Sequence, residues 1–161
     1  MLFTLTRIIR LPFFWIATLI MFAIINGPNL NLLGKREPEI YGSTSFEDFL
    51  SELRNQFPNL DIKYYQSNSE GEIIDRIHEL GFKSPDCQGI ILNPGAYAHY
   101  SYAIADALAA IKIPVVEVHI SNIYKREEFR HKSVTAPQCI GVISGLGLKS
   151  YEAALSFLMS N

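Results

Sequence analysis

Short apolar runs alternate with longer stretches in which apolar residues recur at helical spacing, and the alternation continues along the chain after Met21. This pattern is typical of βαβ units, because parallel strands covered on both faces are apolar at nearly every position. The runs that we interpret as strands are Phe22–Asn26, Leu60–Gln66, Gly89–Leu92, Val115–His119 and Ile140–Ser144.

The helical stretches carry their own start and stop signals. Thr44 and Glu47 are spaced as a capping box, and Ser69 and Glu72 repeat that spacing before a helix that Gly81 would end. We therefore expect helices after Thr44 and after Ser69. Two further helices are predicted over residues 101–110 and 149–159, with a short helical turn over residues 124–129.

These elements together predict an α/β fold. Five parallel strands with intervening helices fit a flavodoxin-like, doubly wound, five-stranded parallel sheet with helices on both faces. Such sheets bind ligands beyond the carboxyl ends of their strands. Functional residues are therefore expected at that edge.

The first twenty residues differ from the rest of the chain, being strongly apolar with Arg7 and Arg10 as a basic flank. A membrane anchor is one interpretation, but the apolar run is shorter than the roughly 20 residues that cross a bilayer and ends inside the first predicted strand. An appended segment, with Met21 as the true start, is the other. We favour the second, with residues 1–20 as an N-terminal extension and residues 21–161 as one α/β domain.

Composition narrows the classes of partner. Of the 161 residues, 48% are hydrophobic and 19% are charged, and the formal net charge is −2. These values exclude a disordered chain and a general nucleic-acid-binding surface. Cys87 and Cys139 each adjoin a predicted strand, so we expect two free thiols in a reducing, cytoplasmic compartment. The expected partner is a small molecule.

The connection after the first predicted strand, residues 26–42, is long for a βα loop and carries Arg36 and Tyr41. Loops of this length are commonly lids or binding loops. A phenol has a pKa near 10 and becomes a usable base only where positive charge favours the phenolate. Arg36 or the more distant Arg130 could supply that charge. The alternative is an exposed tyrosine beside a solvated arginine.

Glu117 and His119 lie two residues apart at the end of a predicted strand and so share one of its faces. A carboxylate beside an imidazole sets its tautomer and favours its protonated form, as a general acid requires. A purely structural pair and a metal site are the alternatives. Because Glu-x-His is a weak metal signal and cysteine ligands are poorly placed, we expect no metal ion.

Two further segments offer groups for an anionic ligand. The segment Asn93–His99 opens the third predicted helix, and N–H groups at a helix start receive carboxylates well. His99 could reach a ligand there. Arg126 and Arg130 are spaced one helical turn apart, so both could face the same way. Surface ion pairs with the glutamates between them are the alternative.

These residues fall in four separated blocks. The blocks are INGPNLNLLG with REPEIYG (25–34 and 36–42), QSNSEG (66–71), NPGAYAH (93–99), and EVHISN with REEFR (117–122 and 126–130). Together they resemble the type II 3-dehydroquinate dehydratases, from about Phe22 to the C-terminus. The resemblance implies a catalytic domain that assembles as a homododecamer of trimers. It also implies a cofactor-free lyase that converts 3-dehydroquinate to 3-dehydroshikimate and water, in the shikimate pathway or in quinate breakdown.

The resemblance further implies roles in an anti elimination through an enol or enolate. Tyr41 would take the proton from C2, and Arg36 would keep that phenol acidic. Asn29 would hold a water molecule at the developing oxyanion. His119, oriented by Glu117, would protonate the departing C1 hydroxyl.

A second set of residues would hold the carboxylate and hydroxyls of the substrate. Asp106 would instead reach into the site of a neighbouring subunit, so activity should depend on assembly. The family often has threonine where this chain has Ala98 and Tyr100, on either side of His99. The expected substrate-binding residues are Asn93, Gly95, His99, Ile120, Ser121 and Arg130.

A non-catalytic, flavodoxin-like ligand-binding module is the alternative from another functional class. The chain has no glycine-rich dinucleotide fingerprint after its first strand. It also has no acidic cluster there, which a phosphoacceptor pocket would need. An enzyme is therefore the favoured interpretation.

Overall fold

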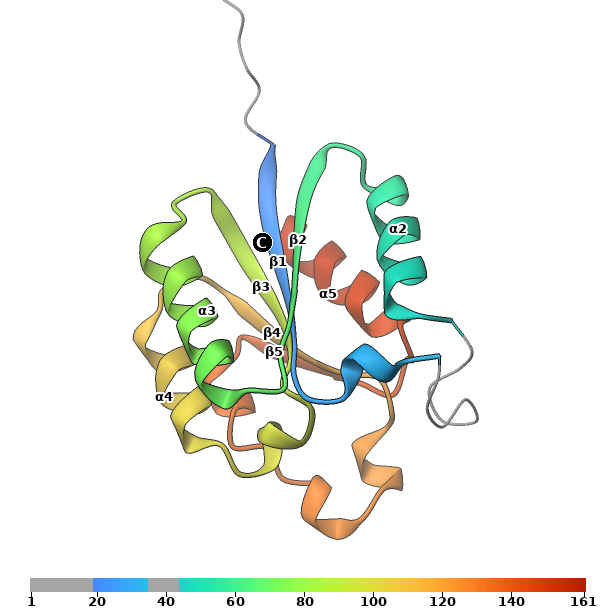
Figure 1. Ribbon diagram of the computed structural model, residues 1–161, viewed down its shortest axis with the longest axis vertical. Coiled ribbons are helices and arrows are strands. Elements are labelled where there is room, and N and C mark those ends of the chain that lie inside the picture. The colour runs from blue at the N-terminus through green and yellow to red at the C-terminus, as the bar shows by residue number, and fades with distance from the viewer. Residues whose placement is uncertain (1–18, 35–43) are drawn as a thin grey trace, which may run out of the picture.

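Five parallel strands form one sheet in the computed structural model, which describes residues 19–34 and 44–161 (Figure 1). The strand order is β2-β1-β3-β4-β5, which is the order of flavodoxin-like sheets. The predicted fold class is confirmed, with strand ends within two residues of those expected. The strands are β1 (Ile20–Asn26), β2 (Leu60–Gln66), β3 (Cys87–Asn93), β4 (Val115–His119) and β5 (Gly141–Ser144).

Helices cover both faces of this sheet (Figure 1). Two of them, α2 and α5, pack on one face, and α3 and α4 pack on the other. Each face therefore has its own apolar core. The bounds of the helices are α2 (Phe46–Gln56), α3 (Glu70–Lys83), α4 (Tyr102–Ala110) and α5 (Lys149–Met159).

The sequence of β1 is apolar because both of its faces are covered. Phe22 and Ile24 belong to the core beneath α2 and α5, whereas Ala23 and Ile25 belong to the core beneath α3 and α4. None of the four is more than 2% exposed. A strand buried on both faces loses the alternation of apolar and polar residues that marks a half-exposed one.

The start of α2 differs from the prediction by one residue. The cap is Ser45, whose Oγ accepts a hydrogen bond from the Asp48 N–H at 3.1 Å and donates one to the Asp48 carboxylate at 2.7 Å. The predicted cap at Thr44 is therefore wrong. The spacing alone did not distinguish Thr44 from Ser45, because each has an acidic residue three positions later. The second predicted cap is confirmed, because Ser69 Oγ accepts from the Glu72 N–H. The other half of the box runs through Ser67, whose Oγ accepts from the Ser69 N–H and donates to the Glu72 carboxylate.

Gly81 does not end α3, which continues to Lys83. A methyl group at Gly81 would lie 2.1 Å from Cγ2 of Ile111 and 2.7 Å from its Cβ. Ile111 follows the last residue of α4. The glycine therefore allows α3 and α4 to approach closely, and it is not a stop signal.

Short 3-10 turns fill the connections near the carboxyl ends of the strands. The single turn predicted over residues 124–129 is two turns, Ile123–Lys125 and Glu128–Arg130. The segment before α4 does not open that helix either. It forms a separate 3-10 turn, Gly95–His99, and α4 follows a new cap at Ser101.

Most of the predicted N-terminal extension lies outside the described residues, which begin at Leu19. Ile20, the last residue assigned to that extension, already belongs to β1. Over residues 19–34 and 44–161, no helix has the length and apolar character needed to cross a membrane.

Gly81→Ala should destabilise the protein by about 1–3 kcal/mol, because the added methyl group would overlap Ile111. Gly71→Ala in the same helix is the matched control. Its methyl group would meet only Ser69 Oγ, at 3.9 Å, and replacing a helical glycine should stabilise the fold by about 0.5–1 kcal/mol. Urea unfolding measures both effects. If the two variants shifted the free energy of unfolding equally, the close contact between α3 and α4 would be disproved.

Candidate active site

A pocket of about 180 Å³ opens at the carboxyl ends of β1, β3 and β4. This is the edge at which a doubly wound sheet is expected to bind ligands. Eight of the predicted site residues lie in its lining, although they come from four separate stretches of sequence. They are Asn29, Asn93, Gly95, His99, His119, Ile120, Ser121 and Arg130.

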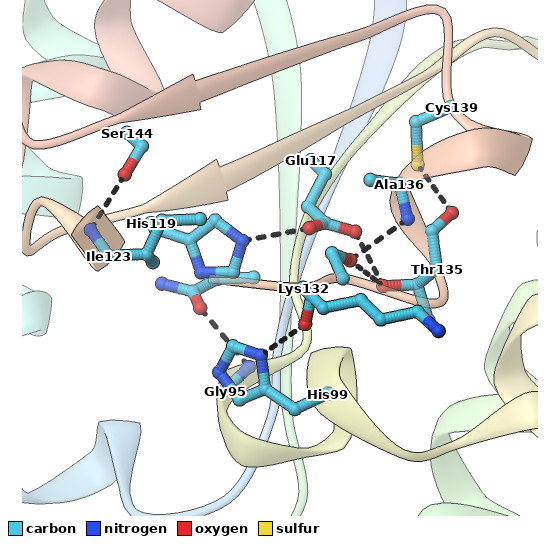
Figure 2. Close-up of polar contacts among 12 residues, drawn as sticks. Gly95, His99, Glu117, His119, Ile123, Lys132, Thr135, Ala136, Cys139 and Ser144 are labelled. Atoms are coloured by element: carbon cyan, nitrogen blue, oxygen red, sulfur yellow. Dashed lines mark hydrogen bonds and ion pairs between the residues drawn. The ribbon is translucent and has the colours of Figure 1, made fainter. Parts of the chain in front are cut away.

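Glu117 lies directly behind His119, as the alternation of β4 predicted (Figure 2). Nε2 of His119 is 2.8 Å from Oε1 of Glu117, and the two side chains are 7% and 0% exposed. An ionised carboxylate can only accept, so Nε2 carries the proton of this hydrogen bond. Nδ1 is then the ring nitrogen through which His119 can exchange a proton with a ligand.

The second oxygen of Glu117 is held by Thr135, a residue that the sequence patterns did not identify. The Thr135 hydroxyl donates to Oε2 of Glu117 at 2.5 Å, and Thr135 is fully buried. Sγ of Cys139 donates in turn to the Thr135 carbonyl (Figure 2). Burial and the neighbouring Glu117 charge raise the pKa of Cys139 to about 12, so this thiol stays protonated.

His99 faces His119 across the pocket. Their ring centroids are 6.3 Å apart and the rings are nearly parallel, at 16°. Nδ1 of His99 donates to the Lys132 carbonyl at 2.9 Å, which leaves Nε2 as an acceptor. Burial lowers the pKa of His99 below its usual range, and the charges of His119 and Arg130 lower it further. A neutral imidazole is therefore favoured at this position.

The loops after β1 and β3 are joined at the floor of the pocket. The Gly27 N–H donates to the Asn93 carbonyl at 2.7 Å, and a methyl group at Gly27 would lie 2.5 Å from the Pro94 oxygen. Asn29 has φ 66° and donates its N–H to Oδ1 of Asn68 at 2.9 Å. Asparagine tolerates this left-handed conformation better than most residues. The turn at Asn29 sets the direction of the loop after β1.

Arg126 and Arg130 both line the pocket and both contact Glu127. Nε of Arg130 lies 2.8 Å from Oε2 of Glu127, and Nε of Arg126 lies 3.5 Å from the same oxygen. Nη1 of Arg126 also donates to Ser121 Oγ at 3.4 Å. For these two arginines, ion pairs with the neighbouring glutamates and side chains that face the same way were alternative predictions, and both are observed. The shared carboxylate of Glu127 therefore holds both guanidinium groups beside the pocket.

Of the predicted site residues that the structure describes, Glu117 and Asp106 do not belong to the lining of this pocket. Arg36 and Tyr41 fall outside the described residues. Asp106 is exposed on α4. Ala98 and Tyr100, which flank His99 in the sequence, are also absent from the lining, and Tyr100 is 59% exposed.

No group of three or more His, Cys, Asp or Glu side chains that could hold a metal ion occurs in the part of the chain that the structure describes. The third side chain that bonds to the Glu117–His119 pair is Thr135. Of the residues that sequence reasoning missed, Thr135 and Tyr151 are fully buried polar partners of the site. Neither belongs to one of the four sequence blocks.

Comparison with known proteins gives one family. The profile described as "Dehydroquinase class II" matches residues 20–159. The 3-dehydroquinate dehydratase of Caldicellulosiruptor bescii is 60% identical over 134 residues, which is 82% of this chain and 91% of that protein. That of Clostridium botulinum is 55% identical over 140 residues, covering 86% and 93%.

Solved structures agree with the sequence relatives. The type II dehydroquinase from Butyrivibrio crossotus is 51% identical with a TM-score of 0.81, covering 87% of this chain and 97% of that one. The type II dehydroquinase from Propionibacterium acnes is 44% identical with a TM-score of 0.82, covering 88% and 97%.

Thr135→Val should cost about 1–3 kcal/mol of stability, because it leaves an oxygen of the buried Glu117 without its hydroxyl donor. Thr135→Ser is the matched control, since it keeps the donor. Urea unfolding at neutral pH compares the two variants. A valine variant as stable as the serine variant would show that this hydroxyl does not support Glu117.

Proposed function

This chain belongs to the class II dehydroquinase family, and we propose from that membership that it removes water from 3-dehydroquinate with His119 as the acid and Tyr41 as the base. The product is 3-dehydroshikimate. The observation that carries the proposal is the buried Glu117, which holds one ring nitrogen of His119 while the other is left for the pocket. That arrangement is suited to a general acid.

The acid step follows from the position of His119. Transfer of the C2 proton to Tyr41 converts the C3 ketone to an enol or enolate, and the C3 carbonyl forms again when water leaves. As the C1–OH bond breaks, His119 donates a proton to the departing oxygen, and the electrons of the enolate form the C1=C2 bond of the enone. Glu117 stabilises the imidazolium before the transfer, which makes it a positioning residue.

The base is assigned to Tyr41 from the resemblance to the family, and the described part of the pocket offers no better candidate. The described residues that line the pocket include no tyrosine and no carboxylate. Of the two histidines, His119 is the acid, and the lowered pKa of His99 makes it a weak proton acceptor. Leu33 lines the pocket, and in the sequence it precedes Arg36 by three residues and Tyr41 by eight.

The remaining lining residues are proposed to hold the substrate. Arg130 would meet the carboxylate, and Asn29 would hold a water molecule at the C3 oxyanion. Dispersed contacts of this kind fix the ring so that the C2 hydrogen and the C1 hydroxyl leave from opposite faces. The other residues in this role are Asn93, Gly95, His99, Ile120 and Ser121.

Assembly is the second part of the proposal. We infer a homododecamer built from trimers, in which Asp106 completes the site of a neighbouring subunit. Its exposure on α4, away from the pocket of its own chain, is what such a role requires. The catalytic domain would begin at Ile20, the first residue of β1, with the residues before it as an extension. The free thiols of Cys87 and Cys139 fit a cytoplasmic location.

Purified protein, with a chelator and without added cofactor, should convert 3-dehydroquinate to a product with the ultraviolet absorbance of an enone. The reaction needs only proton transfers, so removing metal ions should leave the rate unchanged. Absorbance and product chromatography follow the conversion. Binding of 3-dehydroquinate with no turnover would contradict the proposal and would favour a non-catalytic ligand-binding module.

Tyr41→Phe and His119→Gln should each lower kcat by about 10²-fold or more, because each removes a group that transfers a proton. Urea transitions close to that of the unmodified protein would exclude unfolding as the cause. Tyr124→Phe and His78→Gln are the matched controls, since neither residue lines the pocket. Near-normal kcat in Tyr41→Phe would remove Tyr41 as the base even if His119 kept its role.

A further inference from the structure

We propose that Tyr151 is a positioning residue that holds the Asn93 amide in place at the pocket, in the orientation that the Gly95 N–H sets. Tyr151 lies in the first turns of α5 and is fully buried, so it cannot touch a ligand. Its hydroxyl lies 2.8 Å from Nδ2 of Asn93, which lines the pocket, and 2.8 Å from Oδ1 of Asn26 at the end of β1. The inference rests on the proposed function, in which Asn93 contacts the substrate.

The direction of these hydrogen bonds is set by a backbone group. The Gly95 N–H can only donate, and it donates to Oδ1 of Asn93 at 3.2 Å. Nδ2 of Asn93 is therefore the end that faces Tyr151, whose oxygen accepts from it. The one phenol hydrogen is left to donate to Oδ1 of Asn26. The chain of donors runs in a single direction, from Gly95 through Asn93 and Tyr151 to Asn26.

This ordering leaves Asn93 with one free N–H and one free lone pair for a ligand, each at a fixed place. Without the phenol oxygen, the amide would lose the partner of its Nδ2 end. The amide would then be held at one end only, by the Gly95 N–H, and would present its other N–H and lone pair to the substrate less precisely. Tyr151 thus acts on substrate binding through Asn93.

The surroundings of Tyr151 keep its hydroxyl hydrogen-bonded in this order. Its ring contacts Phe46 and Phe49 of α2, with ring centroids 5.0 Å and 5.9 Å away. These contacts stop the phenol from turning away from Asn93. Burial raises the pKa of Tyr151 far above its usual range, so the phenol keeps its proton and the order of donors does not change with pH.

Steady-state kinetics of Tyr151→Phe test the proposal, because this change keeps the ring and removes only the hydroxyl. We expect KM for 3-dehydroquinate to rise about 5–30-fold, the effect of losing one or two neutral hydrogen bonds, with kcat within about twofold. In an Asn93→Ala background, Tyr151→Phe should raise KM no further, because the residue acts through Asn93.

Ile77→Val is the control for a general loss of stability. Ile77 is fully buried on the opposite face of the sheet, and its truncation should lower stability without altering KM. If Tyr151→Phe kept the KM of the unmodified protein, or raised KM equally in the Asn93→Ala background, the positioning role would be overturned while the proposed function stood.

A second measurement does not depend on turnover. The side-chain amide signals of Asn93, assigned by their absence in Asn93→Asp, should be protected from solvent exchange in the unmodified protein and lose that protection in Tyr151→Phe. If the unmodified protein left 3-dehydroquinate unchanged, the proposed function would fail and these signals alone would decide the role of Tyr151. Equal protection in both proteins would overturn it.

Discussion

The close approach of the two central loops is the constraint on which the pocket depends. The Gly27 N–H is bonded to the Asn93 carbonyl, and there is no room for a side chain between Gly27 and Pro94. From this point β1 leads to α2 on one face of the sheet, whereas β3 leads to α4 on the other. A crevice therefore opens between the loops. A larger residue at position 27 would separate Asn29 from His99.

Two ordered polar networks converge on that crevice. One runs from Thr135 through Glu117 to His119, the proposed acid. The other runs through Tyr151 to Asn93, a proposed contact of the substrate. In both, the residue in the middle is fully buried. A buried polar group is costly unless its partners are in place, so each network stabilises one arrangement of the group that reaches the pocket.

Much of the fold and part of the site could be predicted from sequence because they depend on periodicity. The apolar runs predict the sheet, and the alternation within β4 predicts that Glu117 and His119 meet. Thr135 and Tyr151 could not be predicted, because Thr135 contacts Glu117 from 18 residues away and Tyr151 contacts Asn93 from 58 residues away. Such pairings follow from how α5 and the segment before β5 pack. The prediction that Gly81 ends α3 was wrong because glycine permits both a helix end and a close contact between helices.

The surroundings of Glu117 also make the protein convenient for chemical labelling. Burial raises the pKa of Cys87, and burial with the Glu117 charge raises that of Cys139. Because alkylating reagents attack the thiolate, both native cysteines should react with them more slowly at neutral pH than an exposed cysteine does. A single cysteine introduced at an exposed position such as Asn31, between two residues of the pocket lining, can carry a fluorophore while both native thiols stay. Ligand binding can then be followed by fluorescence in a protein whose acid–carboxylate pair is unaltered.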